Sequence, residues 1–195
     1  MALRCFIAVT LPAPLKQSVG TIMRGLSETG ADVKWVPEQN LHLTLKFLGA
    51  TGEEKIEEMT GALRKKLSPY PPFYITIGGV GSFPGGRHPR VIWVGIQEYG
   101  PLEDIYRAVE GVTTRLGYPP EDRPFSPHLT IGRVRSGKRL AEVLKRLDEL
   151  QAADIGEFEV KGVTLMKSEL KPGGAEYSSL AEIQLEGNNG DQGDE

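Results

Sequence analysis

Several residue types are scarce in this 195-residue chain, and each scarcity excludes a class of structure. A single cysteine, Cys5, rules out an internal disulfide, and its place in the apolar run RCFIAV predicts a buried structural thiol. The N-terminal apolar stretch is ended by prolines too soon to span a membrane, and no convincing signal-peptide cleavage region follows it. We therefore expect a cytoplasmic protein without membrane contact.

The chain also lacks a net basic charge. Its formal net charge of −3 argues against a protein that coats nucleic acid non-specifically. Part of the acidic balance lies in the closing run EGNNGDQGDE, which cannot bury enough apolar area to become ordered. We expect residues 1–186 to form a single bilobal domain, residues 187–195 to form a disordered acidic tail, and the protein to be a monomer.

Histidine is also rare, yet two of the three histidines begin the same triplet. His-Leu-Thr occurs at residues 42–44 within NLHLTLKFLG and at residues 128–130 within SPHLTIGRV. Both copies lie in runs of β-favouring residues, where successive side chains point to opposite faces of a strand. Histidine and threonine then share one face while the leucine enters a core.

Hydrophobic periodicity predicts two rounds of the order strand, helix, HLT strand, helix, strand. The expected strands lie at 3–9, 33–36, 41–47, 73–77, 91–96, around 128–131, 158–166 and 178–185. The expected helices lie at 14–28, 102–116 and 140–147, and a further helix follows a capping box formed by Thr51 and Glu54. The two motifs begin 86 residues apart (128 − 42), which favours an internal duplication. We predict an α+β fold with two similar lobes that face each other.

Two imidazoles that face one another can supply a general base and a general acid near neutral pH, as hydrolysis of a phosphodiester requires. Thr44 and Thr130 would donate hydrogen bonds to the non-bridging phosphate oxygens. Lys46 and Arg133 are further candidate donors to phosphate. On a straight strand Lys46 shares the histidine face, whereas Arg133 does not.

This chemistry calls for no metal and no cofactor, but other interpretations exist. A zinc site could use both motif histidines with His88 as a third ligand, although His88 lies in a Gly/Pro-rich loop without a partner at ligand spacing. The loop GSFPGGR contains glycines but lacks the strand-to-helix context and the Lys-Ser/Thr of a P-loop.

The paired HxTx motifs, HLTL and HLTI, resemble those of the two-histidine phosphoesterase superfamily. The segments RCFIAV, VKWVPEQNLHLTLKFLG and FSPHLTIGR extend the resemblance to the RNA 2',3'-cyclic phosphodiesterases, historically called 2'-5' RNA ligases. The resemblance implies a bilobal fold with pseudo-twofold symmetry and a central groove that holds both motifs.

The resemblance also implies a reaction, in which water opens a terminal 2',3'-cyclic phosphate of RNA, such as a tRNA fragment, and leaves a 2'-phosphate. By similarity His42 donates a proton to the 3'-oxygen, His128 activates water, and Thr44 and Thr130 bind the phosphate. The reverse reaction would form a 2'-5' linkage. Two alternatives remain open: an enzyme for another substrate such as ADP-ribose cyclic phosphate or 2',5'-oligoadenylate, and a non-catalytic module that binds RNA ends.

Overall fold

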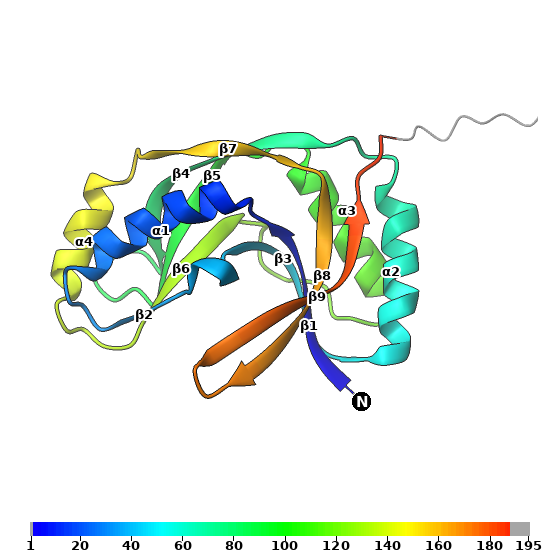
Figure 1. Ribbon diagram of the computed structural model, residues 1–195, viewed down its shortest axis with the longest axis horizontal. Coiled ribbons are helices and arrows are strands. Elements are labelled where there is room, and N and C mark those ends of the chain that lie inside the picture. The colour runs from blue at the N-terminus through cyan, green and yellow to red at the C-terminus, as the bar shows by residue number, and fades with distance from the viewer. Residues whose placement is uncertain (1, 188–195) are drawn as a thin grey trace, which may run out of the picture.

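Two antiparallel sheets with helices packed against them form the structure, a computed structural model that describes residues 2–187 (Figure 1). Sheet A has the strand order β3 (His42–Gly52), β1 (Ala2–Thr10), β8 (Gly162–Lys171) and β9 (Gly174–Gln184). Sheet B has the order β2 (Val33–Trp35), β6 (His128–Val134), β5 (Val91–Glu98), β4 (Phe73–Phe83) and β7 (Asp154–Val160). The predicted α+β class is confirmed.

Each sheet has its own pair of helices. The helices α1 (Ala13–Ser27) and α4 (Leu140–Glu149) contact sheet B, whereas α2 (Glu53–Leu67) and α3 (Leu102–Arg115) contact sheet A. Apolar residues at helical spacing, such as Leu15, Val19 and Leu26 of α1, bury one stripe of each helix. A continuous apolar core joins these stripes to the helix-facing side chains of the strands.

The predicted element order is present twice, as β1-α1-β3-α2-β4 and β5-α3-β6-α4-β7. The two lobes, one around each sheet, are nevertheless not the two halves of the chain. β2 and β4 from the first half belong to sheet B, while β8 and β9 from the end of the chain complete sheet A. In Figure 1, β7 crosses the top of the view and leads directly into β8 of the other sheet.

Two local predictions were wrong. The expected strand 158–166 is two strands in different sheets, β7 and β8, which are separated at Lys161. The Thr51/Glu54 capping box is absent, because Thr51 belongs to β3 and α2 begins after Gly52 without a side-chain cap. The Thr51 hydroxyl instead donates to the Gly49 carbonyl and accepts a hydrogen bond from Tyr118.

Other expectations concern burial and the end of the chain. Cys5 is buried, as predicted, and burial raises the pKa of its thiol. The predicted tail lies outside the described residues except for Gly187, whose amide donates to the Tyr70 carbonyl at 3.0 Å. Within residues 2–187, no helix is long and apolar enough to cross a membrane.

Candidate active site

The two HLT motifs lie on strands that contact each other across the junction of the sheets. The first opens β3 and the second opens β6, and these two strands are in contact. Leu43 and Leu129 are fully buried on the helix side of their sheets. His42, Thr44, His128 and Thr130 are partly exposed on the opposite side, which we call the histidine face. The predicted alternation of side chains along the strand, with His and Thr on one face and Leu on the other, therefore holds for both triplets.

Both imidazole rings are held in the same way by the backbone. His42 Nδ1 lies 2.7 Å from the Asn40 carbonyl, and His128 Nδ1 lies 2.7 Å from the Ser126 carbonyl. A carbonyl can only accept, so each Nδ1 carries the proton and donates it. Each Nε2 is then the nitrogen left for chemistry, and within residues 2–187 no hydrogen bond occupies it.

A long-range contact fixes the carbonyl that holds the first ring. Asn40 ends a short 3-10 helix, η1 (Glu38–Asn40), and its side-chain amide donates to the Ala175 carbonyl at 2.7 Å. Ala175 lies at the start of β9, near the turn of the β8–β9 hairpin. The hairpin thereby helps to fix the orientation of His42.

Aromatic rings enclose both histidines. The His42 ring lies 4.8 Å from Phe6 and 5.3 Å from Tyr177, measured between ring centroids, and the Tyr177 contact is edge-on. The His128 ring meets Phe83 edge-on at 5.1 Å, and Phe83 in turn lies 5.1 Å from Trp93. These contacts limit the rotation of the two imidazoles.

Burial lowers the pKa of His42 below its ordinary value of 6.5. The hydrogen bond to the Asn40 carbonyl opposes this shift, whereas the positive charge of Lys16 adds to it. Lys16, on the first turns of α1, donates to the Gln39 carbonyl at 3.0 Å. His42 is therefore biased toward the neutral form before a ligand binds.

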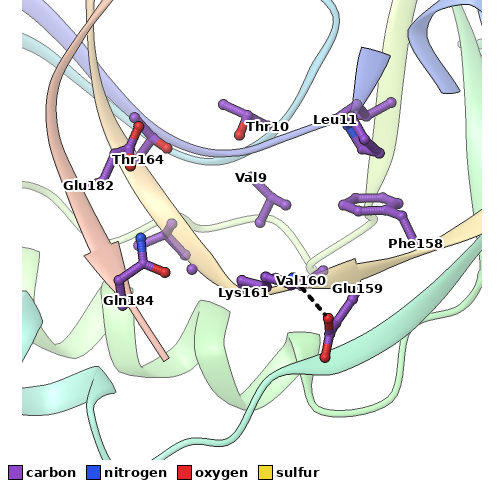
Figure 2. Close-up of a pocket in the computed structure, with 13 residues that line it drawn as sticks. Val9, Thr10, Leu11, Phe158, Glu159, Val160, Lys161, Thr164, Glu182 and Gln184 are labelled. Atoms are coloured by element: carbon purple, nitrogen blue, oxygen red, sulfur yellow. Dashed lines mark ion pairs between the residues drawn. The ribbon is translucent and has the colours of Figure 1, made fainter. Parts of the chain in front are cut away.

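A cavity of about 460 Å³ lies next to the first motif (Figure 2). Its polar side chains include Thr10, Thr164, Glu182 and Gln184, from β1, β8 and β9. The four motif residues do not line it. The cavity is thus separate from the two catalytic candidates, although Thr10 is the register partner of His42.

A β-bulge follows each motif and reverses the predicted positions of two residues. In the pairing of β1 with β3, Ile7 is opposite Lys46 and Ala8 is opposite Thr44, so Leu45 is an extra residue. Lys46 therefore turns to the helix side, where it is only 6% exposed. The prediction that Lys46 shares the histidine face is wrong, because a bulge shifts the alternation by one residue.

The second bulge has the opposite consequence for Arg133. In the pairing of β5 with β6, Ile92 is opposite Gly132 and Trp93 is opposite Thr130, so Ile131 is the extra residue. Arg133, opposite Val91, is exposed on the same face as Thr130. Within residues 2–187 its guanidinium makes no hydrogen bond or ion pair. Arg133 thus remains a candidate phosphate ligand, which a straight strand would not permit.

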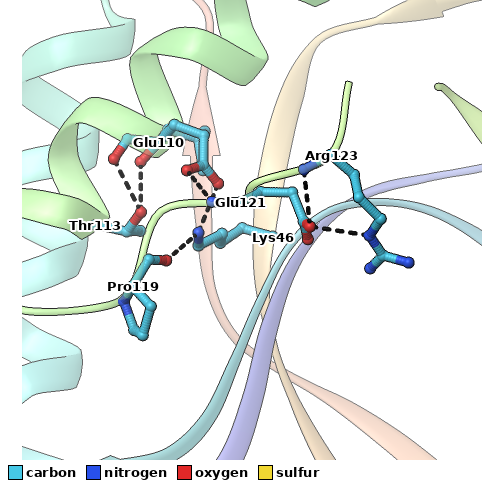
Figure 3. A network of polar contacts seen from close by, with 7 residues as sticks. Lys46, Glu110, Thr113, Pro119, Glu121 and Arg123 are labelled. Carbon is cyan, nitrogen blue, oxygen red and sulfur yellow. Dashed lines mark hydrogen bonds and ion pairs between the residues drawn. The ribbon is translucent and has the colours of Figure 1, made fainter. Parts of the chain in front are cut away.

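Lys46 belongs to a buried polar network that links the two motif segments (Figure 3). Its Nζ lies 2.7 Å from Glu110 Oε1 on α3 and donates to the Pro119 carbonyl at 2.7 Å. The other carboxylate oxygen of Glu110 accepts from the Glu121 amide at 3.1 Å. Pro119 and Glu121 belong to the loop that leads into β6, so the network holds this loop against β3.

Metal ligands do not cluster in the part of the chain that the structure describes. Within residues 2–187, no group of three or more His, Cys, Asp and Glu side chains could hold a metal ion. His88 lies in the exposed loop between β4 and β5, outside the two motif strands. The structure therefore offers no support for a zinc site made of the three histidines.

Sequence patterns missed the residues that surround the rings. Lys16, Phe83 and Tyr177 are distant from their histidines in the chain, and nothing in their local sequence distinguishes them from ordinary surface or strand residues. Only the pairing of strands brings them to the motifs. No local signal could have found them.

Comparisons with known proteins identify the family of the chain. The sequence model of the 2'-5' RNA ligase superfamily matches residues 12–172. A Methanothermobacter thermautotrophicus protein named RNA 2',3'-cyclic phosphodiesterase is 37% identical over 185 residues, covering 95% of this chain and 100% of that protein. A Thermotoga maritima protein of the same name is 34% identical and covers 95% and 97%, respectively.

Solved structures have the same fold. The crystal structure of TT0787 from Thermus thermophilus aligns with a TM-score of 0.79 at 27% identity and covers 94% of this chain and 98% of that one. The crystal structure of Escherichia coli LigT complexed with 3'-AMP aligns with a TM-score of 0.75 at 24% identity and covers 95% of this chain and 99% of that one. At this identity the likeness is evidence for the fold alone. With the family match spanning both HLT strands, the chain belongs to the 2'-5' RNA ligase superfamily.

Proposed function

We propose that this protein hydrolyses the 2',3'-cyclic phosphate at an RNA end to a 2'-phosphate. The observation that carries the proposal is the matched pair of histidines, each with Nδ1 bonded to a backbone carbonyl at 2.7 Å and Nε2 without a protein partner in residues 2–187. The names of relatives that are 30–37% identical support the choice of substrate.

The two imidazole rings, each held by a backbone carbonyl, suit acid–base chemistry on opposite sides of a phosphorus atom. In the neutral ring Nε2 has a lone pair and can take a proton from water, whereas in the charged ring Nε2 has a proton to give. The water oxygen forms a bond to phosphorus while the bond between phosphorus and the 3'-oxygen breaks. One imidazole takes the proton from water and the other protonates the departing 3'-oxygen.

We assign the acid role to His42 and the base role to His128, following the family resemblance. Burial lowers the pKa of His42 in the empty site, which by itself disfavours the charged form that an acid needs. A bound phosphate supplies a negative charge beside Nε2 and raises the pKa again. In this proposal the substrate itself brings His42 into its active protonation state.

Three further side chains would hold the phosphate. Thr44 and Thr130 lie two residues beyond the histidines on the same face, and their hydroxyls can donate to the non-bridging oxygens. Arg133 reaches this face through the bulge after Thr130 and can donate two hydrogen bonds at once. Lys46 has no part in this set, because Glu110 and Pro119 already bind its ammonium group.

The proposed steps need no metal ion, since the two imidazoles perform both proton transfers. Run in reverse, the same groups would join a cyclic phosphate to a 5'-hydroxyl and form a 2'-5' linkage. The decisive experiment is incubation of a short RNA that ends in a 2',3'-cyclic phosphate with the protein in excess chelator. Phosphorus NMR then reads the position of the product phosphate.

A 2'-phosphate product in excess chelator is the expected result. An unchanged substrate would reject the proposed activity, and a 3'-phosphate would reject the assignment of the leaving oxygen. Activity that appears only after a divalent metal is restored would reject the metal-free mechanism.

A further inference from the structure

The cavity of Figure 2 continues the histidine face of sheet A away from the first motif. Strand pairing places Thr44, Ala8, Thr164 and Glu182 in one row across β3, β1, β8 and β9. Because neighbouring strands are about 4.8 Å apart, Thr164 lies about 10 Å and Glu182 about 14 Å from Thr44 along this row. The cavity therefore begins beside the proposed phosphate position and extends one to two strands beyond it.

Four polar side chains of this cavity have no hydrogen-bond or ion-pair partner among the described residues. Within residues 2–187, the side chains of Thr10, Thr164, Glu182 and Gln184 make no hydrogen bond or ion pair. Thr164 is only 7% exposed as a residue, but its hydroxyl is accessible from the cavity rather than sealed from solvent. A cavity of about 460 Å³ with four polar side chains that have no partner in the described residues can bind a ligand with hydrogen-bonding groups.

The charges that line the cavity disfavour a phosphate as this ligand. Lys161 is the basic residue in the lining, and its Nζ lies 3.3 Å from the Glu159 carboxylate. Glu182 adds a further negative charge. Such a lining repels an anion but accepts the hydroxyl groups of ribose and the N–H groups of a base.

We propose that this cavity binds the ribose and base of the nucleotide that precedes the cyclic-phosphate end of the RNA. The inference rests on the proposed function, because the hydrolysed phosphate must lie between the two motifs. The proposed function places the ribose that carries this phosphate beside the motif residues, which do not line the cavity. We place the next nucleoside in the 5' direction there, because the cavity lies about 10–14 Å from Thr44 along the row.

The test compares two substrates that share the same reacting end. One is a 2',3'-cyclic mononucleotide, and the other is a dinucleotide that ends in the same cyclic nucleotide. The wild-type protein should have the higher kcat/KM on the dinucleotide. Thr164→Val and Glu182→Gln should each lower the ratio of dinucleotide to mononucleotide kcat/KM by about three- to tenfold, the effect of one lost hydrogen bond.

Two controls separate the cavity from the protein surface. Glu176→Gln removes a carboxylate from an exposed position on β9 outside the cavity and should leave both rates unchanged. The ratio should also be insensitive to salt, since no unpaired cation lines the cavity among the described residues. Glu182 is exposed, so its substitution tests the site without a folding defect.

Equal kcat/KM values for the two substrates in the wild type, or an unchanged ratio in both variants, would overturn the proposal. A ratio that collapses at high salt would overturn it too, because it would mean that the second phosphate provides the contact. If neither substrate is hydrolysed, the proposed function itself fails and the cavity assignment fails with it.

Discussion

Replacement of Lys46 by methionine tests whether this lysine is structural, as its buried position indicates. Its Nζ loses the ion pair with Glu110 at 2.7 Å and the hydrogen bond to the Pro119 carbonyl at 2.7 Å. The two side chains are only 6% and 15% exposed, so the carboxylate is left with little water. Breaking such a pair from one side costs about 3–5 kcal/mol. For a chain of this size, that loss lowers Tm by about 6–20 °C.

The assay is urea or thermal unfolding, with two comparison variants. Lys46→Met combined with Glu110→Leu should recover most of the lost free energy of unfolding, since an apolar pair of similar volume often replaces a buried ion pair without loss. Lys161→Met breaks the exposed pair with Glu159 at 3.3 Å and should cost less than about 1 kcal/mol. The difference between the two lysines isolates the effect of burial.

One result would refute this reasoning. If Lys46→Met unfolds at the same urea concentration as the wild type but has a higher KM for the cyclic-phosphate RNA, Lys46 contacts substrate. The loop before β6 would then not depend on the ion pair. In the expected case the folded fraction of the variant keeps its KM, and the loss appears in stability.

Four further predictions concern the two motif histidines and Arg133. His42→Ala or His128→Ala should lower turnover at least about 10²-fold with the fold intact, and near-normal turnover in either variant would defeat the two-histidine mechanism. The pKa of His42 is lowered from 6.5 in the folded protein, so the unfolded chain binds the proton first as pH falls, and His42 lowers the free energy of unfolding below about pH 6.5. His42→Gln should therefore reduce the loss of unfolding free energy between pH 7 and pH 5.5 in urea titrations. The same dependence on pH in the variant and the wild type would contradict the effect of burial on this pKa. In NMR titrations, a bound 2'-nucleotide should raise the pKa of His42. If the pKa of His42 stays lowered in the complex, the assignment of His42 as the acid and His128 as the base would have to be reversed. Arg133→Lys should raise KM by about tenfold with little change in stability, since the exposed guanidinium has no protein partner within residues 2–187. An unchanged KM would show that Arg133 does not bind the phosphate.

Local sequence was sufficient for the parts of this protein that depend on neighbouring residues. Alternation along a strand predicted that His42 and Thr44 share one face, with Leu43 in the core, and the same reasoning held for the second triplet. The order of helices and strands followed from hydrophobic periodicity in the same way. These features are set by interactions over a few residues, which a single sequence displays directly.

Tertiary structure decided the features that depend on distant partners. Lys46 and Arg133 lie on the opposite faces from those expected, because a bulge arises when one strand pairs with another. The extra residue shifts the side chains that follow it by one position. The division of the chain between the two sheets, and the contacts of Phe6, Phe83 and Tyr177 with the imidazoles, likewise depend on which strands pair. The sequence by itself determined which groups are candidates for the chemistry and on which side of each strand the two triplets lie. The pairing of strands far apart in the chain decided which groups surround them, because those contacts exist only after the sheets have formed.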